Sequence, residues 1–145
     1  MSEAIKQAKM SLKLEEVPIG CVIVKDGEIV SKGRNKREKT QNALMHAEID
    51  AINKACKKLG SWRLDGCTLY VTLAPCPMCA GAIANARIKK VVYGAEDFSG
   101  NDEIMRDIFN STRLNHKVDV VFEKSEICSK LITNFFKERR KLKEL

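Results

Sequence analysis

The sequence predicts an α/β fold, a three-layer α/β/α arrangement around one mixed five-stranded sheet. In the second half of the chain, strand-like segments alternate with helical ones, and such alternation places neighbouring strands parallel. In the first half, two strand-like segments flank Asp26-Gly27, a dipeptide typical of a tight turn, which predicts an antiparallel hairpin. The 145 residues fit a single domain, residues 1–145, with a core of its own.

The first half is predicted to hold two helices and the hairpin. Residues 2–14 form a helix because apolar side chains recur every three or four positions. The first strand of the hairpin covers residues 19–25, which are rich in Val and Ile. The second covers residues 28–32, directly after the turn. Residues 33–45 are expected to be a polar loop, and residues 46–59 a second helix that ends before a glycine.

The second half is predicted to alternate strands and helices up to the C-terminus. Strands are expected at residues 67–73, 89–94 and 117–123. Helices are expected at residues 77–86, at 102–110, and after Ser125, whose hydroxyl suits the cap position. The last helix carries an apolar face made of Ile127, Leu131, Ile132, Phe135 and Phe136.

Composition indicates a globular protein, expected to be cytoplasmic. No apolar run is long enough to cross a membrane, and Lys6, Lys9 and Lys13 interrupt any signal-peptide core at the N-terminus. In the cytoplasm thiols stay reduced, so we expect two metal-ligating cysteines and four ordinary buried thiols rather than three disulfides. The net charge is +7, with basic residues clustered near the end (Lys137, Arg139, Arg140, Lys141 and Lys143). A solvated helix face and a phosphate-binding surface both explain that cluster.

Two short motifs carry the chemistry: His46-Ala47-Glu48 and Pro75-Cys76-Pro77-Met78-Cys79. They supply one imidazole and two thiols, three ligands that leave a fourth zinc position for water, as catalytic zinc sites do. H-x-E followed by P-C-x-x-C is the signature of zinc-dependent nucleobase deaminases. Taken alone, the cysteines could also be a redox pair or half of a structural zinc site, and His46 could be an ordinary helix-start residue.

The spacing of these residues predicts where the metal lies. Cys76 and Cys79 are one helical turn apart, so their sulfurs face one side of a helix start. His46 and Glu48 are two apart and can share a pocket only at a loop-to-helix junction, so two helix N-termini should converge on one zinc ion. Glu48 would then be the acid/base that moves protons between water, a ring nitrogen and a leaving amine.

At these residues the chain resembles the cytidine/deoxycytidylate deaminase superfamily, and within it the tRNA-specific adenosine deaminases of the TadA type. The resemblance covers nearly the whole chain. Its further segments are Val17-Pro18-Ile19-Gly20, Gly33-Arg34-Asn35, Leu69-Tyr70-Val71-Thr72-Leu73, Asn115-His116-Lys117-Val118 and Phe135-Phe136 with Arg139-Arg140.

The resemblance implies a cytidine-deaminase-like fold and a homodimer that converts the wobble adenosine of a tRNA anticodon stem-loop to inosine. It implies one zinc ion per subunit, held by His46, Cys76 and Cys79, with Glu48 as the proton shuttle. It also places Asn35 against the target base and Ile19 in the pocket wall. Asn35 as a turn residue and Ile19 as strand core are the plainer interpretations, and Phe135 and Phe136 fit either a core or a surface that meets RNA.

The chain departs from the pattern of that family in three segments that flank the pocket mouth. Ala74 stands where the family usually has Glu, Asn42-Ala43-Leu44-Met45 precedes His46 where Asp-Pro-Thr-Ala is usual, and Phe98 to Glu103 replaces a Gly-rich loop. These departures leave the exact substrate open, although none removes a ligand or the shuttle. Two alternative functions also remain: a deaminase of a free nucleobase or nucleotide such as cytosine or guanine, and a non-catalytic, zinc-bearing RNA-binding subunit.

Overall fold

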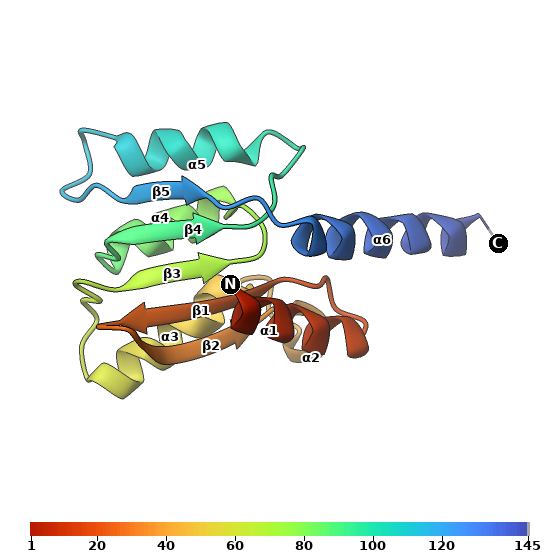
Figure 1. Cartoon of the computed structure of the whole chain (residues 1–145), viewed down its shortest axis with the longest axis horizontal. Helices are drawn as coiled ribbons and strands as arrows, with labels where there is room; N and C mark the ends of the chain where they lie inside the picture. The colour runs from red at the N-terminus through yellow and green to blue at the C-terminus, as the bar shows by residue number, and fades with distance from the viewer. Residues whose placement is uncertain (145) are drawn as a thin grey trace.

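The protein is built on one five-stranded mixed sheet, seen in a computed structural model that describes residues 1–144 (Figure 1). The spatial order of the strands is β2-β1-β3-β4-β5. β1 runs antiparallel to both β2 and β3, whereas β3, β4 and β5 are parallel, which confirms the predicted mixed sheet. The strands are β1 (Gly20–Lys25), β2 (Glu28–Arg34), β3 (Thr68–Val71), β4 (Lys90–Tyr93) and β5 (Asp119–Phe122).

Helices cover both faces of the sheet (Figure 1). They are α1 (Ser2–Lys13), α2 (Arg37–Thr40), α3 (Ala47–Leu59), α4 (Pro77–Asn85), α5 (Asn101–Asn110) and α6 (Glu126–Lys143). α1 packs against the hairpin on one face and α3 on the other, while α4 lies beside α3 and α5 beside α4. Among the described residues no helix is both long enough and apolar enough to cross a membrane.

Two glycines allow α1 and α3 to approach the hairpin closely from opposite sides. A Cβ on Gly20 would collide with the Ala4 carbonyl oxygen of α1 and would lie 2.5 Å from the Ala8 nitrogen. A Cβ on Gly33 would meet the Ala47 carbonyl oxygen of α3 in the same way. Since neighbouring residues of a strand point to opposite faces, and Cys21 pairs with Gly33 and Gly20 with Arg34, the two contacts lie on opposite faces of the sheet.

We therefore expect Gly20→Ala to lower the free energy of unfolding by about 3 kcal/mol, because the added methyl meets backbone atoms that cannot rotate away. Chemical denaturation measured by circular dichroism would give the value. Gly27→Asn is the matched control: Gly27 has φ of 79° at the hairpin turn, with open space around it, and Asn tolerates that conformation. Equal stability of the Gly20→Ala protein and the wild type would contradict the close approach of α1.

The core lies between the sheet and the α3–α4 layer. Inward positions alternate along the strands, and paired examples are Ile23 with Leu69 and Val71 with Tyr93. Cys21, Cys67 and Cys128 are fully buried free thiols, and Cys56 is partly buried against the core. This agrees with the prediction of four ordinary thiols outside the metal motif.

The structure corrects the prediction for residues 33–45. β2 continues to Arg34, and α2 forms within the segment that was expected to be a plain loop. α2 has only four residues and is held by hydrogen bonds from distant parts of the chain, so no periodic pattern marked it.

The apolar face of α6 is only partly covered. Phe135 is 9% exposed, whereas Ile127 and Phe136 are 53% and 44% exposed. α6 begins beside the sheet and then extends beyond it (Figure 1), where it contacts α1 and Arg139 donates to the Glu15 carbonyl oxygen. Thus Phe135 follows the core interpretation and Phe136 does not. The predicted cap is confirmed, since the Ser125 hydroxyl accepts a hydrogen bond from the Cys128 N–H.

Candidate active site

The start of α3 and the start of α4 meet on one side of the sheet. His46 is the N-cap of α3 and Cys76 the N-cap of α4, both with extended backbone, and Pro77 occupies the first turn of α4. Proline is favoured there because its missing N–H is not needed. The predicted loop-to-helix junction at His46 is therefore confirmed: His46 is the N-cap residue of α3, and Glu48 lies in the first turn of that helix.

The three candidate ligands form one compact cluster. The Nδ1 atom of His46 lies 3.6 Å from the Cys76 sulfur and 3.5 Å from the Cys79 sulfur. All three donor atoms lie within 4.8 Å of one another. Zn–S bonds of about 2.3 Å and Zn–N bonds of about 2.0 Å at tetrahedral angles separate N from S by about 3.5 Å. The donor set and its spacing therefore fit a zinc ion, and His46, Cys76 and Cys79 could hold it.

The electrostatics of the cluster favour a charged thiolate. The pKa of Cys76 is lowered to about 4, first by a hydrogen bond from the Cys79 thiol and then by His46. The pKa of Cys79 is raised, because its proton serves that hydrogen bond and its sulfur is buried. The contact with Cys76 raises the pKa of His46. Thiolate is the form of cysteine that binds metal, so Cys76 is already in its metal-binding form at neutral pH.

Glu48 is buried beside the cluster and is only 4% exposed. Burial raises the pKa of its carboxyl group to about 7, and the negative charge of Cys76 contributes to the same direction. A carboxyl group whose pKa lies near neutrality can both accept and donate a proton at neutral pH. This is the property that a proton shuttle requires.

Asn35 and Ile19 lie next to one another, and Lys36, which follows Asn35, donates its N–H to the Met45 carbonyl oxygen beside His46. The Asn35 N–H donates to the Ile19 carbonyl oxygen at 3.1 Å. The Asn35 side chain is buried, donates to the Val17 carbonyl oxygen at 3.2 Å and accepts from the Arg37 N–H at 3.1 Å. These contacts agree with the plainer interpretation of Asn35 as a turn residue. The second proton of its side-chain amide is still free to bond to a ligand.

A cavity of about 730 Å³ opens between the Ile19 side of the sheet and α6. Apolar walls come from Ile19, Leu73 and Phe136, and Lys137 and Arg140 stand at its α6 side. Phe98, which is 87% exposed, belongs to the loop on its opposite side. Its lining reaches Leu73, three residues before Cys76, but includes none of the three candidate ligands and not Glu48, so this cavity is not itself the pocket of the cluster.

The three segments that depart from the family pattern take up different places. Ala74 is buried in the core, and its N–H donates to the Ala95 carbonyl oxygen at 2.9 Å. Leu44, in the second segment, is exposed two positions before His46. In the third, Asp97 accepts hydrogen bonds from Ser99 and Asn101, and Gly100 between them is the N-cap of α5 with φ of 90°.

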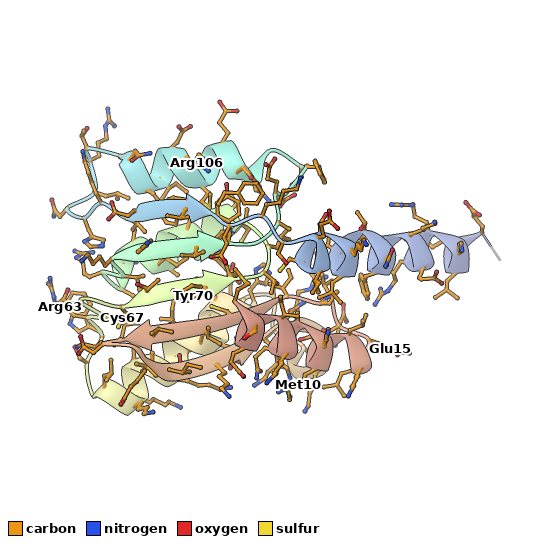
Figure 2. All side chains as sticks on the ribbon, in the orientation of Figure 1. Met10, Glu15, Arg63, Cys67, Tyr70 and Arg106 are labelled. Atoms are coloured by element: carbon orange, nitrogen blue, oxygen red, sulfur yellow. The ribbon has the colours of Figure 1, made fainter. Side chains whose placement is uncertain are left out.

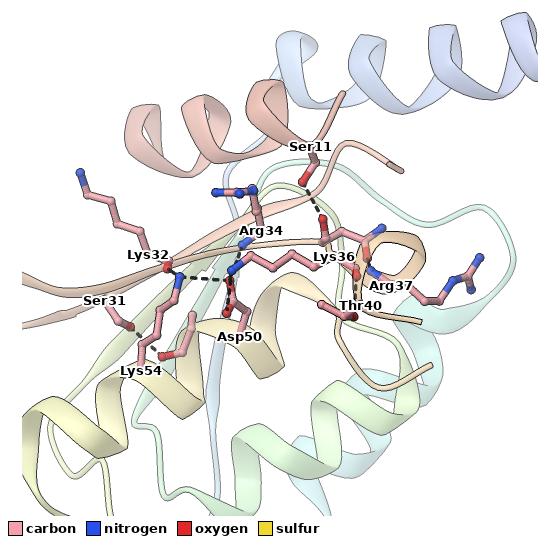
Figure 3. Close-up of polar contacts among 11 residues, drawn as sticks. Ser11, Ser31, Lys32, Arg34, Lys36, Arg37, Thr40, Asp50 and Lys54 are labelled. Atoms are coloured by element: carbon pink, nitrogen blue, oxygen red, sulfur yellow. Dashed lines mark hydrogen bonds and ion pairs between the residues drawn. The ribbon is translucent and has the colours of Figure 1, made fainter. Parts of the chain in front are cut away.

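Sequence reasoning missed two buried carboxylates near the site, Asp50 and Glu16. Asp50 accepts from the Arg34 N–H at 3.1 Å and forms ion pairs with Lys36 and Lys54 at 3.2 and 3.3 Å (Figure 3). It thereby ties the end of β2 to the first turns of α3. An acidic residue two positions after Glu48, in a helix with a buried face, was the signal available in the sequence.

Comparisons with known proteins identify the family to which this fold and cluster belong. The sheet and the His-Cys-Cys cluster are those of a deaminase, and the family model of the MafB19-like deaminases matches residues 1–140. A Bacillus subtilis tRNA-specific adenosine deaminase is 47% identical over 99% of this chain and 91% of its own length. One from Aquifex aeolicus is 41% identical over 94% and 91%. The chain belongs to the family of tRNA-specific adenosine deaminases.

Solved structures agree with that assignment. A structure from work on A-to-I editing by tRNA:A34 deaminases is 38% identical, with a TM-score of 0.79 over 85% of this chain and 95% of that one. A guanine deaminase from Bacillus subtilis is 34% identical, with a TM-score of 0.65 over 96% and 90%. These neighbours bear out the cytidine-deaminase-like fold.

Proposed function

We propose that this protein is a zinc-dependent hydrolytic deaminase that converts adenosine to inosine at the wobble position of a tRNA anticodon. The observation that carries the proposal is the cluster of His46, Cys76 and Cys79 with the buried Glu48 at its side. The family of tRNA-specific adenosine deaminases supports the tRNA substrate. A cytoplasmic homodimer completes the proposal, as the family resemblance implies.

Each residue of the site has a separate task in this proposal. His46, Cys76 and Cys79 hold one zinc ion per subunit, which when bound lowers the pKa of the attacking water. Ile19 forms part of the wall against which the base packs. Asn35 offers its free amide proton to the base, while its other contacts keep the side chain fixed.

Glu48 moves the protons of the reaction. It takes one proton from the water that attacks the amino-bearing ring carbon and delivers it to the neighbouring ring nitrogen. It then carries the proton of the new hydroxyl group to the amine. The carbon–nitrogen bond breaks, ammonia leaves, and the ring keeps a carbonyl oxygen. A carboxyl group with a pKa of about 7 suits both transfers.

The surface around the cavity suits an RNA loop. Single-stranded loop bases are recognised when they are splayed into pockets, while basic side chains hold the backbone. Lys137 and Arg140 line the cavity, and Arg139 stacks over Phe135 at 4.8 Å and donates to the Glu15 carbonyl oxygen at 3.1 Å. Arg139, in the basic C-terminal part of α6, is thus bonded to the segment that follows α1.

We expect the zinc-loaded protein to produce inosine in total tRNA from its organism, read by sequencing as guanosine at the wobble position. The competing function is deamination of a free base, which the likeness to a guanine deaminase favours. Ammonia release from free guanine, cytosine and adenine is therefore measured in parallel. Release from a free base without inosine in tRNA would contradict the proposal. Tight tRNA binding without either product would favour a non-catalytic subunit.

A further inference from the structure

Glu16 is a buried carboxylate that does not belong to the cluster described above. It is 2% exposed, directly before the Val17-Pro18 segment that leads into β1. One carboxylate oxygen accepts from the Glu38 N–H at 2.9 Å and the other from the Lys39 N–H at 3.0 Å. Its own N–H donates to the Ser11 carbonyl oxygen at 3.0 Å. Both ends of the residue are therefore fixed, and it joins the end of α1 to α2.

The segment that Glu16 holds is a closed loop, residues 36–45, that leads into the metal cluster. The Lys36 N–H donates to the Met45 carbonyl oxygen at 3.0 Å, which closes the neck of the loop. The next residue, His46, donates its N–H to the Leu44 carbonyl oxygen at 2.8 Å. Apart from these bonds at its neck, the loop is held to the body at α2 by Glu16, near its start by the Asn35 side chain, and at Lys36 by an ion pair with Asp50 of α3 at 3.2 Å.

The outer face of loop 36–45 is basic and exposed. Arg37 and Lys39 are both exposed on α2. Lys36, directly before Arg37, donates its N–H to the Met45 carbonyl oxygen next to His46, so α2 begins beside the cluster. The loop therefore presents cations beside the site where the reacting base would bind, and cations at such a place attract the phosphates on either side of that base.

We propose that Glu16 is a positioning residue for the substrate: its carboxylate fixes loop 36–45 so that the exposed cations of α2 meet the tRNA backbone next to the target nucleotide. This inference rests on the proposed function. Charge-assisted hydrogen bonds to two adjacent N–H groups set both the position and the direction of a short helix. No other carboxylate of the described chain accepts from the N–H groups of α2.

Loss of this anchor should change substrate binding more than chemistry. His46 is held independently, because its carbonyl oxygen accepts from the Asp50 N–H at 3.0 Å as α3 begins. Glu48 lies on the same helix. The metal ligands and the proton shuttle therefore keep their places when loop 36–45 moves, and KM for tRNA rises while kcat stays.

The test compares Glu16→Gln with Glu15→Gln in the full-length, zinc-loaded protein. Gln keeps the shape of Glu16 but turns an NH2 group toward one of the two N–H donors. Glu15 loses the same charge one position away, from an exposed side chain at the end of α1 (Figure 2). Kinetics on tRNA are combined with zinc content, thermal unfolding and hydrogen exchange at the Glu38 and Lys39 amides.

For Glu16→Gln we expect KM to rise roughly tenfold with kcat within about twofold of the wild type, and the two amides to exchange roughly tenfold faster. Glu15→Gln should match the wild type in each measurement. Should Glu16→Gln fail to fold, Lys39→Ala removes an exposed cation that α2 presents, while its backbone N–H still bonds to Glu16, and this variant should also raise KM.

Three results separate the inference from the function on which it rests. Unchanged amide exchange in Glu16→Gln would overturn the inference, and so would equal KM values for Glu16→Gln and Glu15→Gln while the wild type makes inosine. A fall in kcat or zinc content at constant KM would also overturn it, because Glu16 would then act on the metal site. Absence of inosine with the wild type would instead overturn the proposed function, and with it the substrate part of the inference.

Discussion

A protein carrying Glu48→Gln should bind zinc as the wild type does and deaminate at least roughly 10³-fold more slowly. Gln has nearly the size and shape of Glu, so it fits the buried position beside the cluster. It cannot accept a proton from water and pass it to the ring nitrogen. The loss should therefore appear in kcat, with zinc content and unfolding temperature close to those of the wild type.

Glu28→Gln is the matched control for this variant. Glu28 is exposed at the start of β2, beside the hairpin turn, and belongs to neither motif. Inosine formation in tRNA is followed over time for both variants, and zinc is measured by atomic spectroscopy. Should Glu48→Gln keep more than about a tenth of the wild-type rate, the carboxyl group would not be the shuttle, and a different acid/base would have to be sought.

The second large effect is expected for Cys79→Ala. The Cys79 sulfur is buried and lies 3.5 Å from His46, so its removal leaves two protein ligands where a zinc site needs at least three. Bound zinc should fall from about one per chain to nearly none, and inosine formation should be lost with it. The stabilisation that zinc gives the wild type, about 4 kcal/mol at a free concentration 1,000 times Kd, should be lost too.

Cys56→Ala is the control that separates a ligand from an ordinary thiol. Cys56 is a partly buried free cysteine of α3 with no partner in the cluster, so this variant should keep its zinc and its activity. Thermal unfolding with and without added zinc distinguishes the two: the midpoint of Cys56→Ala should rise with zinc, as for the wild type, and that of Cys79→Ala should not. A zinc-dependent rise in Cys79→Ala would remove Cys79 from the ligand set.

The parts of the fold that could be predicted from the sequence are those set by neighbouring residues. Asp26-Gly27 has the left-handed backbone that a two-residue hairpin demands, with φ of 51° and 79°. His46 and Glu48 could be placed at a helix start because two residues at that spacing diverge within a helix. In both cases the chemistry of two or three adjacent residues decides the local structure.

The parts that could not be predicted depend on contacts across the chain. In the sequence, Glu16 is part of a segment that ends a helix. Only the structure shows that its carboxylate accepts from the Glu38 N–H, 22 residues further along the chain. Asp50 is likewise explained by Lys36, 14 residues away. Ile127 and Phe136 follow a core-like pattern but are 53% and 44% exposed, and a periodic pattern does not say whether a partner layer is present.

The strand order β2-β1-β3-β4-β5 has a consequence for how the protein is made. The hairpin, α1 and α3 all lie within residues 2–59, so this half can begin to pack while the rest is still being synthesised. At that moment β1 is paired with β2 alone, and His46 is present before Cys76 and Cys79 have been made. Only when β3 joins β1 and α4 follows can three ligands capture a metal ion. A metal ion held by His46, Cys76 and Cys79 would therefore join the later part of the chain to the earlier part.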